Sequence, residues 1–264
     1  MNETGTQPSR PTKLLRFARF SALLGAVLLA VAGPGHRLRL LPFDVAVNGP
    51  FLAGVLAALA AFVLAGWVLM TSKRGRSEPR AWRNWLAFAF GAAVVIAAAH
   101  WYWQLHSAPM LHDVSTDTSQ PPPFVEALAR RAADHAVNSA DYVRDYSVGS
   151  AAVNAPAVQK AAYPDVQTIL LKMKPPEAFA AAEKTARAMS WEMVAVVPNE
   201  GRIEATATSL YFGLKDDIAI RVRSERDGRG SVVDVRSSAR IGANDAGANA
   251  SHIRAYAKRL KSTR

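Results

Sequence analysis

Seven polar residues of the C-terminal half have side chains that could act as acids, bases or cation ligands: Asp117, Lys215, Asp216, Asp217, Arg240, Asp245 and Asn249. Paired carboxylates such as Asp216 and Asp217 can shift each other's pKa, hold a cation or transfer protons. The same residue types also have structural uses, because Asp245 stands where a helix would be capped and Arg240 could neutralise a carboxylate. We favour the structural interpretation and keep a catalytic or binding site as the alternative.

Sequence signatures of catalysis and metal binding are otherwise missing. The chain has no cysteine, which excludes disulfides, thiolate catalysis and Cys-ligated metals. It has no Gly-x-Ser-x-Gly, Gly-x-Gly-x-x-Gly or P-loop motif. His100, His106 and His112 are six residues apart, a spacing that does not place them on one helix face. We therefore expect no metal and no cofactor, and we expect a protein that is not an enzyme.

The N-terminal half contains three apolar stretches, at about residues 14–32, 50–70 and 85–105. A helix of about 20 apolar residues covers the roughly 30 Å hydrocarbon core of a bilayer. Arg16 and Arg19 interrupt the first stretch, and we expect them to snorkel to the interface. The pattern predicts a membrane domain over 1–106, a linker over 107–123 and a folded domain over 124–264.

Positive charge alternates between the segments that flank these spans. Lys and Arg occur four times before Phe20, where the uncharged part of the first span begins. They occur twice between the first and second spans, five times between the second and third, and next at Arg130. Basic loops stay in the cytoplasm, so we expect a cytoplasmic N-terminus and a periplasmic or extracellular C-terminal domain in a bacterial inner membrane. Five of the six tryptophans, which prefer the membrane–water boundary, fall near the ends of the second and third spans.

The net charge of +11 is concentrated beside the spans. Residues 1–105 carry 11 Lys and Arg against three acids, whereas residues 106–264 carry 21 against 18. A nucleic-acid-binding protein would need a basic face on its folded domain. We therefore expect the basic residues to interact with the lipid bilayer and not with nucleic acid.

The C-terminal half shows the patterns of an α+β domain. We predict a short helix over 124–134, then mostly loop with short helical pieces up to residue 162. The later elements, in order, are a strand at 166–172, a helix from Pro175, strands at 191–197, 202–208, 218–224 and 231–237, and a helix from Asn244 or Asp245 to about Leu260. The order β-α-β-β-β-β-α predicts a mainly antiparallel sheet with helices on one face.

The sequence of the last two predicted strands, 218–224 and 231–237, predicts how they pair. If Ile220 pairs with Val235, then Val222 pairs with Val233 and all four side chains share one face. The same register places Arg221 opposite Asp234 on the other face. We expect this to be an exposed ion pair worth about 0–1 kcal/mol.

Several separate motifs resemble a bacterial family catalogued as domain of unknown function 1499. They occur at residues 112–117 (HDVSTD), 162–165 (AYPD), 201–206 (GRIEAT), 212–217 (FGLKDD) and 236–250, with Ala239 where a serine is more usual. The resemblance covers about residues 110–261. It implies an envelope or membrane setting and no particular activity.

These observations leave three hypotheses for function. The leading one is a non-enzymatic envelope protein whose extracytoplasmic domain binds a partner protein or an amphiphilic ligand. The second is a membrane-anchored hydrolase-like enzyme that uses the Asp, Lys and Arg residues named above. The third is a membrane-assembly factor that acts mainly through its spans.

Overall fold

The computed structural model describes residues 13–72, 76, 81–226, 228 and 230–262. The chain divides into two compact units, one of residues 1–102 with Tyr211–Gly213, and one of residues 103–210 with 214–264. Four basic residues used to predict the orientation (Arg10, Lys73, Arg74 and Arg80) lie outside the described residues, as do Asp227 and Arg229 of the predicted hairpin turn.

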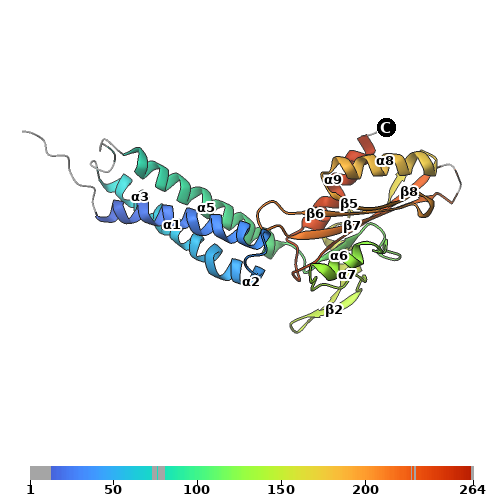
Figure 1. Cartoon of the computed structure of the whole chain (residues 1–264), viewed down its shortest axis with the longest axis horizontal. Coiled ribbons are helices and arrows are strands. Elements are labelled where there is room, and N and C mark those ends of the chain that lie inside the picture. Colours follow the sequence, from blue (N-terminus) through green and yellow to red (C-terminus); the bar gives the residue numbers. More distant parts are fainter. Residues whose placement is uncertain (1–12, 73–75, 77–80, 227, 229, 263–264) are drawn as a thin grey trace, which may run out of the picture. The chain divides into compact units, whose positions relative to one another are not determined.

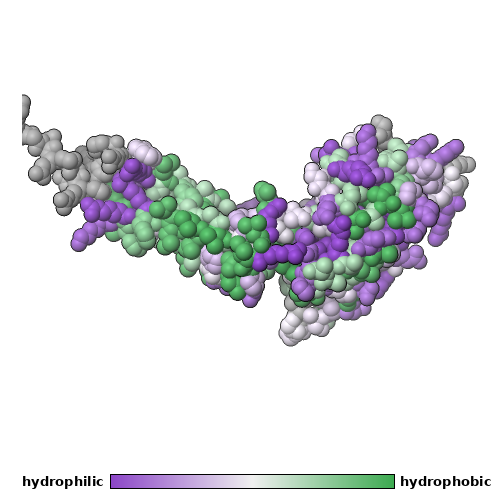
Figure 2. Space-filling view, in the orientation of Figure 1, coloured by the Kyte–Doolittle hydropathy of each residue, from purple (hydrophilic) through white to green (hydrophobic). Residues whose placement is uncertain are grey.

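The first unit contains three helices long and apolar enough to cross a membrane (Figure 1). They are α1 (Lys13–Arg37), the run of α2 (Phe43–Ala46), a π-helix (Val47–Phe51) and α3 (Leu52–Thr71), and α5 (Trp82–Ser107), of which residues 103–107 belong to the second unit. Apolar residues cover much of the visible surface of this unit (Figure 2). These helices confirm the prediction of three apolar N-terminal helices of membrane-spanning length.

Small residues allow the spanning helices to approach closely. A Cβ added at Gly25 of α1 would lie 3.0 Å from the carbonyl oxygen of Gly54 in α3, and one added at Gly91 of α5 would lie 2.6 Å from that of Ala58. Contacts between small residues of this kind are common where helices pack inside a bilayer. Arg19, which we expect to snorkel, donates its Nε hydrogen to Oδ1 of the buried Asn84 near the start of α5, at 2.9 Å.

The second unit is built on an antiparallel sheet of order β1-β8-β7-β6-β5, with β4 also paired to β8. Its strands are β1 (Asp113–Ser115), β4 (Ile169–Leu171), β5 (Glu192–Val197), β6 (Arg202–Thr208), β7 (Lys215–Ser224) and β8 (Ser231–Ala239). Ile220 pairs with Val235, Val222 with Val233 and Arg221 with Asp234, which confirms the predicted register.

One face of the sheet carries the apolar core and is covered by α8 (Pro175–Ala188) and α9 (Ala248–Ser262) (Figure 1). Ile203, Ile218 and Val235 point to this face, where they pack with apolar residues of both helices. The Tyr256 hydroxyl of α9 donates a hydrogen bond to the carbonyl oxygen of Ala182 in α8, at 3.1 Å. The two long helices thus lie on one face, as predicted.

The opposite face is also covered, which the sequence did not indicate. The segment between β1 and the separate hairpin of β2 (Asp145–Val148) and β3 (Ala151–Asn154) runs beneath the sheet and includes the short α6 (Ala127–Ala133). A helix α7 (Ala155–Ala162) follows β3. Phe124 and Ala127 pack against Ala219 of β7. Residues 113–115, expected in the linker, are instead a sheet strand.

Candidate functional site

The seven residues singled out from the sequence do not form one site. Side chains alternate along a strand, so the neighbours Asp216 and Asp217 of β7 point to opposite faces of the sheet. Asp217 lies on the α6 face with Lys215 and Arg240, whereas Asp216 lies on the α9 face near Asp245 and Asn249. Asp117 belongs to a second group on the α6 face, around Asp234, described below.

Asp217 is the centre of a buried ion-pair network. Its side chain is fully buried and accepts hydrogen bonds from Thr206 Oγ1 (2.9 Å), Arg131 Nη1 (2.9 Å) and Arg240 Nη2 (2.6 Å). Arg240 Nε donates a further bond, at 2.9 Å. Both guanidinium groups are themselves buried. The Asp217 carboxylate therefore has its acceptor positions filled by the protein itself.

Asp134 extends this network at the end of α6. It accepts hydrogen bonds from Arg240 Nη1 and, at 2.6 Å, from Lys215 Nζ. Burial alone would lower the pKa of Arg240, but hydrogen bonds and opposite charge from Asp217 and Asp134 raise it overall. Burial lowers the pKa of Arg131, with Asp217 opposing the shift. Lys215, Asp217 and Arg240 thus meet in one network, together with Arg131, Asp134 and Thr206, which the sequence did not single out.

A second group surrounds Asp234 and contains Asp117. Asp234 is fully buried and accepts hydrogen bonds from Arg221 (3.0 Å), Arg223 (2.6 Å) and Thr168 (2.7 Å). Asp117 accepts bonds from Ser119 and Gln120 and lies 3.2 Å from Arg221 Nη2. The predicted Arg221–Asp234 pair exists, but the expectation that it is exposed was wrong.

Two more buried carboxylates lie on the α6 face. Glu204 accepts the backbone N–H groups of Val125 (3.0 Å) and Ala127 (2.8 Å) at the start of α6, and a bond from Arg202. Asp113 accepts two-pronged bonds from Arg236, at 3.0 Å to Nε and 2.6 Å to Nη2. No sequence pattern distinguishes these residues from surface charges, because alternation of polar and apolar side chains is typical of a strand with one solvated face.

The remaining three predicted residues lie around the start of α9. Asp245 accepts the N–H groups of Gly247 and Asn249, both at 2.8 Å, and so acts as the expected cap. The Asn249 side chain accepts a bond from Ser237 Oγ (2.6 Å) and donates one to the carbonyl oxygen of His112 (2.9 Å). With Asn244 or Asp245 predicted as the N-cap, the helix itself begins two to three residues later than predicted, since Ala246 and Gly247 have φ of 52° and 82°.

Asp216 lies beside His252 in the same region. The distance from Asp216 Oδ2 to His252 Nδ1 is 3.7 Å. Burial, reinforced by the charges of Asp245 and Asp217, raises the pKa of Asp216 to about 7. Burial likewise raises the pKa of Asp245 and lowers that of His252. Within the described ranges, no group of three or more His, Asp or Glu side chains is placed to hold a metal ion.

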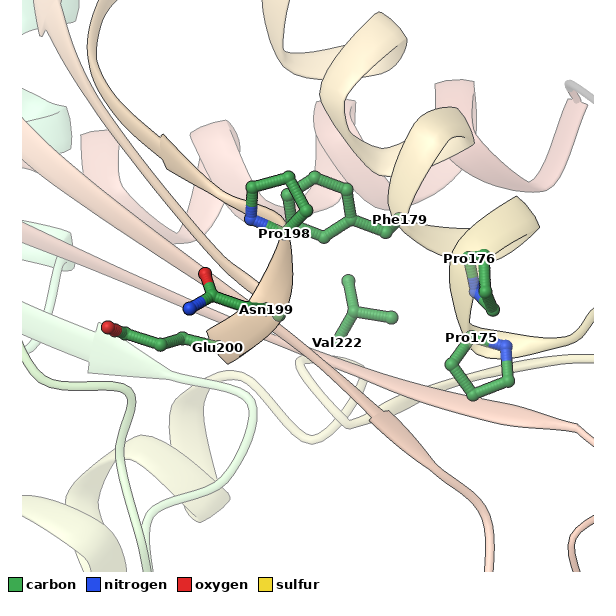
Figure 3. A pocket seen from close by; sticks show the side chains of 8 residues that line it. Pro175, Pro176, Phe179, Pro198, Asn199, Glu200 and Val222 are labelled. Carbon is green, nitrogen blue, oxygen red and sulfur yellow. The ribbon is translucent and has the colours of Figure 1, made fainter.

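A pocket of about 520 Å³ lies between the start of α8 and the β5–β6 turn (Figure 3). Its lining is mostly apolar and consists of Pro175, Pro176, Phe179, Pro198, Asn199, Glu200, Gly201 and Val222. The rings of Phe179 and Pro198 form one wall, the two α8 prolines form the other, and Val222 lies between them.

The polar groups of the pocket lie at one end of it. The Glu200 carboxylate already accepts a hydrogen bond from Arg202 Nε, at 2.9 Å. A Cβ at Gly201 would lie 2.1 Å from the carbonyl oxygen of Val222, so only glycine permits this approach of the turn to β7. The sequence marked Pro175–Pro176 as a helix start and residues 198–201 as a turn, but nothing in it indicated that they meet.

Fold and site together define an α+β domain with one apolar and one ion-paired sheet face, joined in sequence to helices long enough to span a membrane. The family described as protein of unknown function (DUF1499) matches residues 113–260, and the chain belongs to this family. No curated protein matches the chain. The family match confirms the resemblance seen in the sequence motifs.

Proposed function

We propose that this protein is a membrane-anchored binding protein whose α+β domain lies outside the cytoplasm and receives the apolar part of an amphiphilic ligand. The pocket between α8 and the β5–β6 turn carries this proposal. It is large enough for a small ligand, since typical ligand pockets have volumes of about 300–1,000 Å³. Its walls are proline, phenylalanine and valine side chains, which favour apolar groups over charged ones.

Binding is better supported than catalysis. A general acid or base must reach its substrate, whereas Asp217 and Arg240 are buried and bound to each other and to neighbouring side chains. The hydrolase hypothesis depended on these residues. Their geometry instead favours a structural role for the Asp, Lys and Arg group.

The proposed orientation rests on the distribution of basic residues along the chain. The segments before the first span and between the second and third carry four and five Lys or Arg, and those on the other side carry two and none. This arrangement supports a cytoplasmic N-terminus and a periplasmic or extracellular domain in a bacterial inner membrane, where lipids and other amphiphiles are at hand.

Photo-crosslinking tests the pocket directly. The full-length protein in lipid nanodiscs is exposed to palmitate carrying a diazirine group, and the labelled peptides are identified by mass spectrometry. We expect label on peptides that contain Pro175–Phe179 or Pro198–Val222. Val222→Phe narrows the pocket and should weaken this labelling about tenfold, which corresponds to roughly 1.4 kcal/mol of binding free energy.

Two further variants distinguish the effect of filling the pocket from a general loss of folding stability. Pro176→Phe adds bulk at an exposed part of the pocket wall and should act like Val222→Phe without disturbing the core. Leu170→Phe places the same ring on the exposed side of β4, outside the pocket, and should label like the wild type. Label confined to the spanning helices, or equal in all four proteins, would contradict the proposal.

A further inference from the structure

Asp216 and His252 are titratable groups that face each other between the sheet and α9. Their side chains are 14% and 26% exposed, and Oδ2 and Nδ1 are 3.7 Å apart. The Ser237 hydroxyl lies 3.5 Å from the same imidazole nitrogen. In the described part of the chain, no hydrogen bond is donated to the Asp216 carboxylate. This differs from Asp113, Asp217 and Asp234, each of which accepts bonds from an arginine.

The surroundings disfavour charge on both groups. Asp245, at the start of α9, places a second carboxylate near Asp216, and Asp217 adds a third from the same strand. Arg131 and Arg240 oppose them from the other face of the sheet, where both are already bonded to Asp217. The Trp191 ring packs edge-on to the imidazole, with centroids 6.2 Å apart. An aspartate and a histidine in such a place both favour their neutral forms.

We propose that Asp216 and His252 form a proton-compensated pair, in which folding moves a proton from the imidazole to the carboxyl group without net exchange with solvent. In the folded protein Asp216 keeps a proton and His252 is neutral. In the unfolded chain His252 carries the proton and Asp216 is ionised. The start of α9 then keeps its stability over the range in which either group alone would make it depend on pH.

Asp216 and His252 have opposite effects on how the free energy of unfolding changes with pH. Unfolded Asp and His titrate near pH 3.9 and 6.5. The pKa of Asp216 is raised to about 7 in the folded state, so by itself it loses stability as pH rises from about 4 to 7. The pKa of His252 is lowered, so by itself it loses stability as pH falls below about 6.5. Below about pH 6.5 and above about pH 4, for as long as His252 stays neutral in the folded state, the folded and unfolded states bind equal numbers of protons at this pair.

Removing one partner at a time tests the compensation. The full-length protein in nanodiscs is compared as wild type, Asp216→Asn and His252→Gln by hydrogen–deuterium exchange of α9 peptides at pH 5.0 to 7.0, corrected for intrinsic exchange. Relative to wild type, Asp216→Asn should lose protection as pH falls, and His252→Gln should lose it as pH rises. Each change can reach about tenfold per pH unit, the effect of one proton.

Asp141→Asn, an exposed aspartate on the connection after α6, is the matched control and should follow the wild type at every pH. Deuteration at the C2 position of His252 in the wild type gives its pKa without any substitution, and we expect a value below 6.5. A His252 pKa above 6.5 would mean an ion pair with an ionised Asp216 and would overturn the proposal. Two variants with the same pH dependence as wild type would overturn it as well.

Discussion

Every buried carboxylate described on the α6 face of the sheet is bonded to at least one arginine: Asp113 to Arg236, Glu204 to Arg202, Asp217 to Arg131 and Arg240, and Asp234 to Arg221 and Arg223. Intact buried pairs contribute little net stability, because desolvation offsets the attraction between the charges. Removing one partner is costly, because the other charge stays buried alone.

Asp217→Asn is the sharpest test of this ion-paired face. It removes the negative charge that holds both Arg131 and Arg240, so we expect a loss of about 3–5 kcal/mol in the free energy of unfolding. Pulse proteolysis in urea on the full-length protein measures this change. Asp141→Asn, at the surface, should change stability by less than about 0.5 kcal/mol.

The outcome also distinguishes two roles of Asp217. A catalytic carboxylate could be replaced with loss of activity and little change in stability. If Asp217→Asn is as stable as the wild type, Asp217 has no structural role in the buried network, and it becomes a candidate catalytic residue again.

At the scale of the elements, the start of helix α6 depends on Glu204, a residue of strand β6. It has seven residues, too few for an isolated helix to be stable, and no side-chain cap of its own. Glu204 of β6 accepts the N–H groups at its start, where a negative charge is favoured by the helix dipole. α6 is therefore fixed by the sheet that it covers.

Glu204→Gln should release the start of α6 selectively. The amide loses the charge and part of the acceptor capacity, and we expect the helix to lose about 1–3 kcal/mol of local stability. Hydrogen–deuterium exchange should rise in peptides covering Ala127–Ala133 and stay unchanged in α8 and α9. Equal protection of α6 in both proteins would show that Glu204 does not hold it.

The sequence predicted the apolar side of the domain better than its charged side. Alternating Ile and Val in β7 and β8 determined the hairpin register, and three- and four-residue spacing located α8 and α9. The three-residue β1 is too short to show a period, and Arg202, Glu204 and Thr206 have the polarity of a solvated face. Only the tertiary arrangement shows that α6 buries them.

At the scale of the whole molecule, the proposed sidedness is open to a direct test. Alkaline phosphatase fused after Arg264 should be active in bacterial cells, because it folds only outside the cytoplasm, and green fluorescent protein at the same place should stay dark. Fusions at Arg76, between the second and third spans, should give the reverse pattern. A fluorescent fusion after Arg264 would refute the outward position of the domain.

The motifs that relate this chain to its family lie mainly in the ion-paired interior, at positions such as Asp113, Glu204, Asp217, Arg236 and Arg240. The pocket walls formed by Pro175, Phe179, Pro198 and Val222 lie outside those motifs. Membership of the family therefore supports a shared scaffold and carries no information about the proposed ligand. Ligand preference should be sought by comparing wall residues, and shared motifs alone would give no reason to transfer a ligand between relatives.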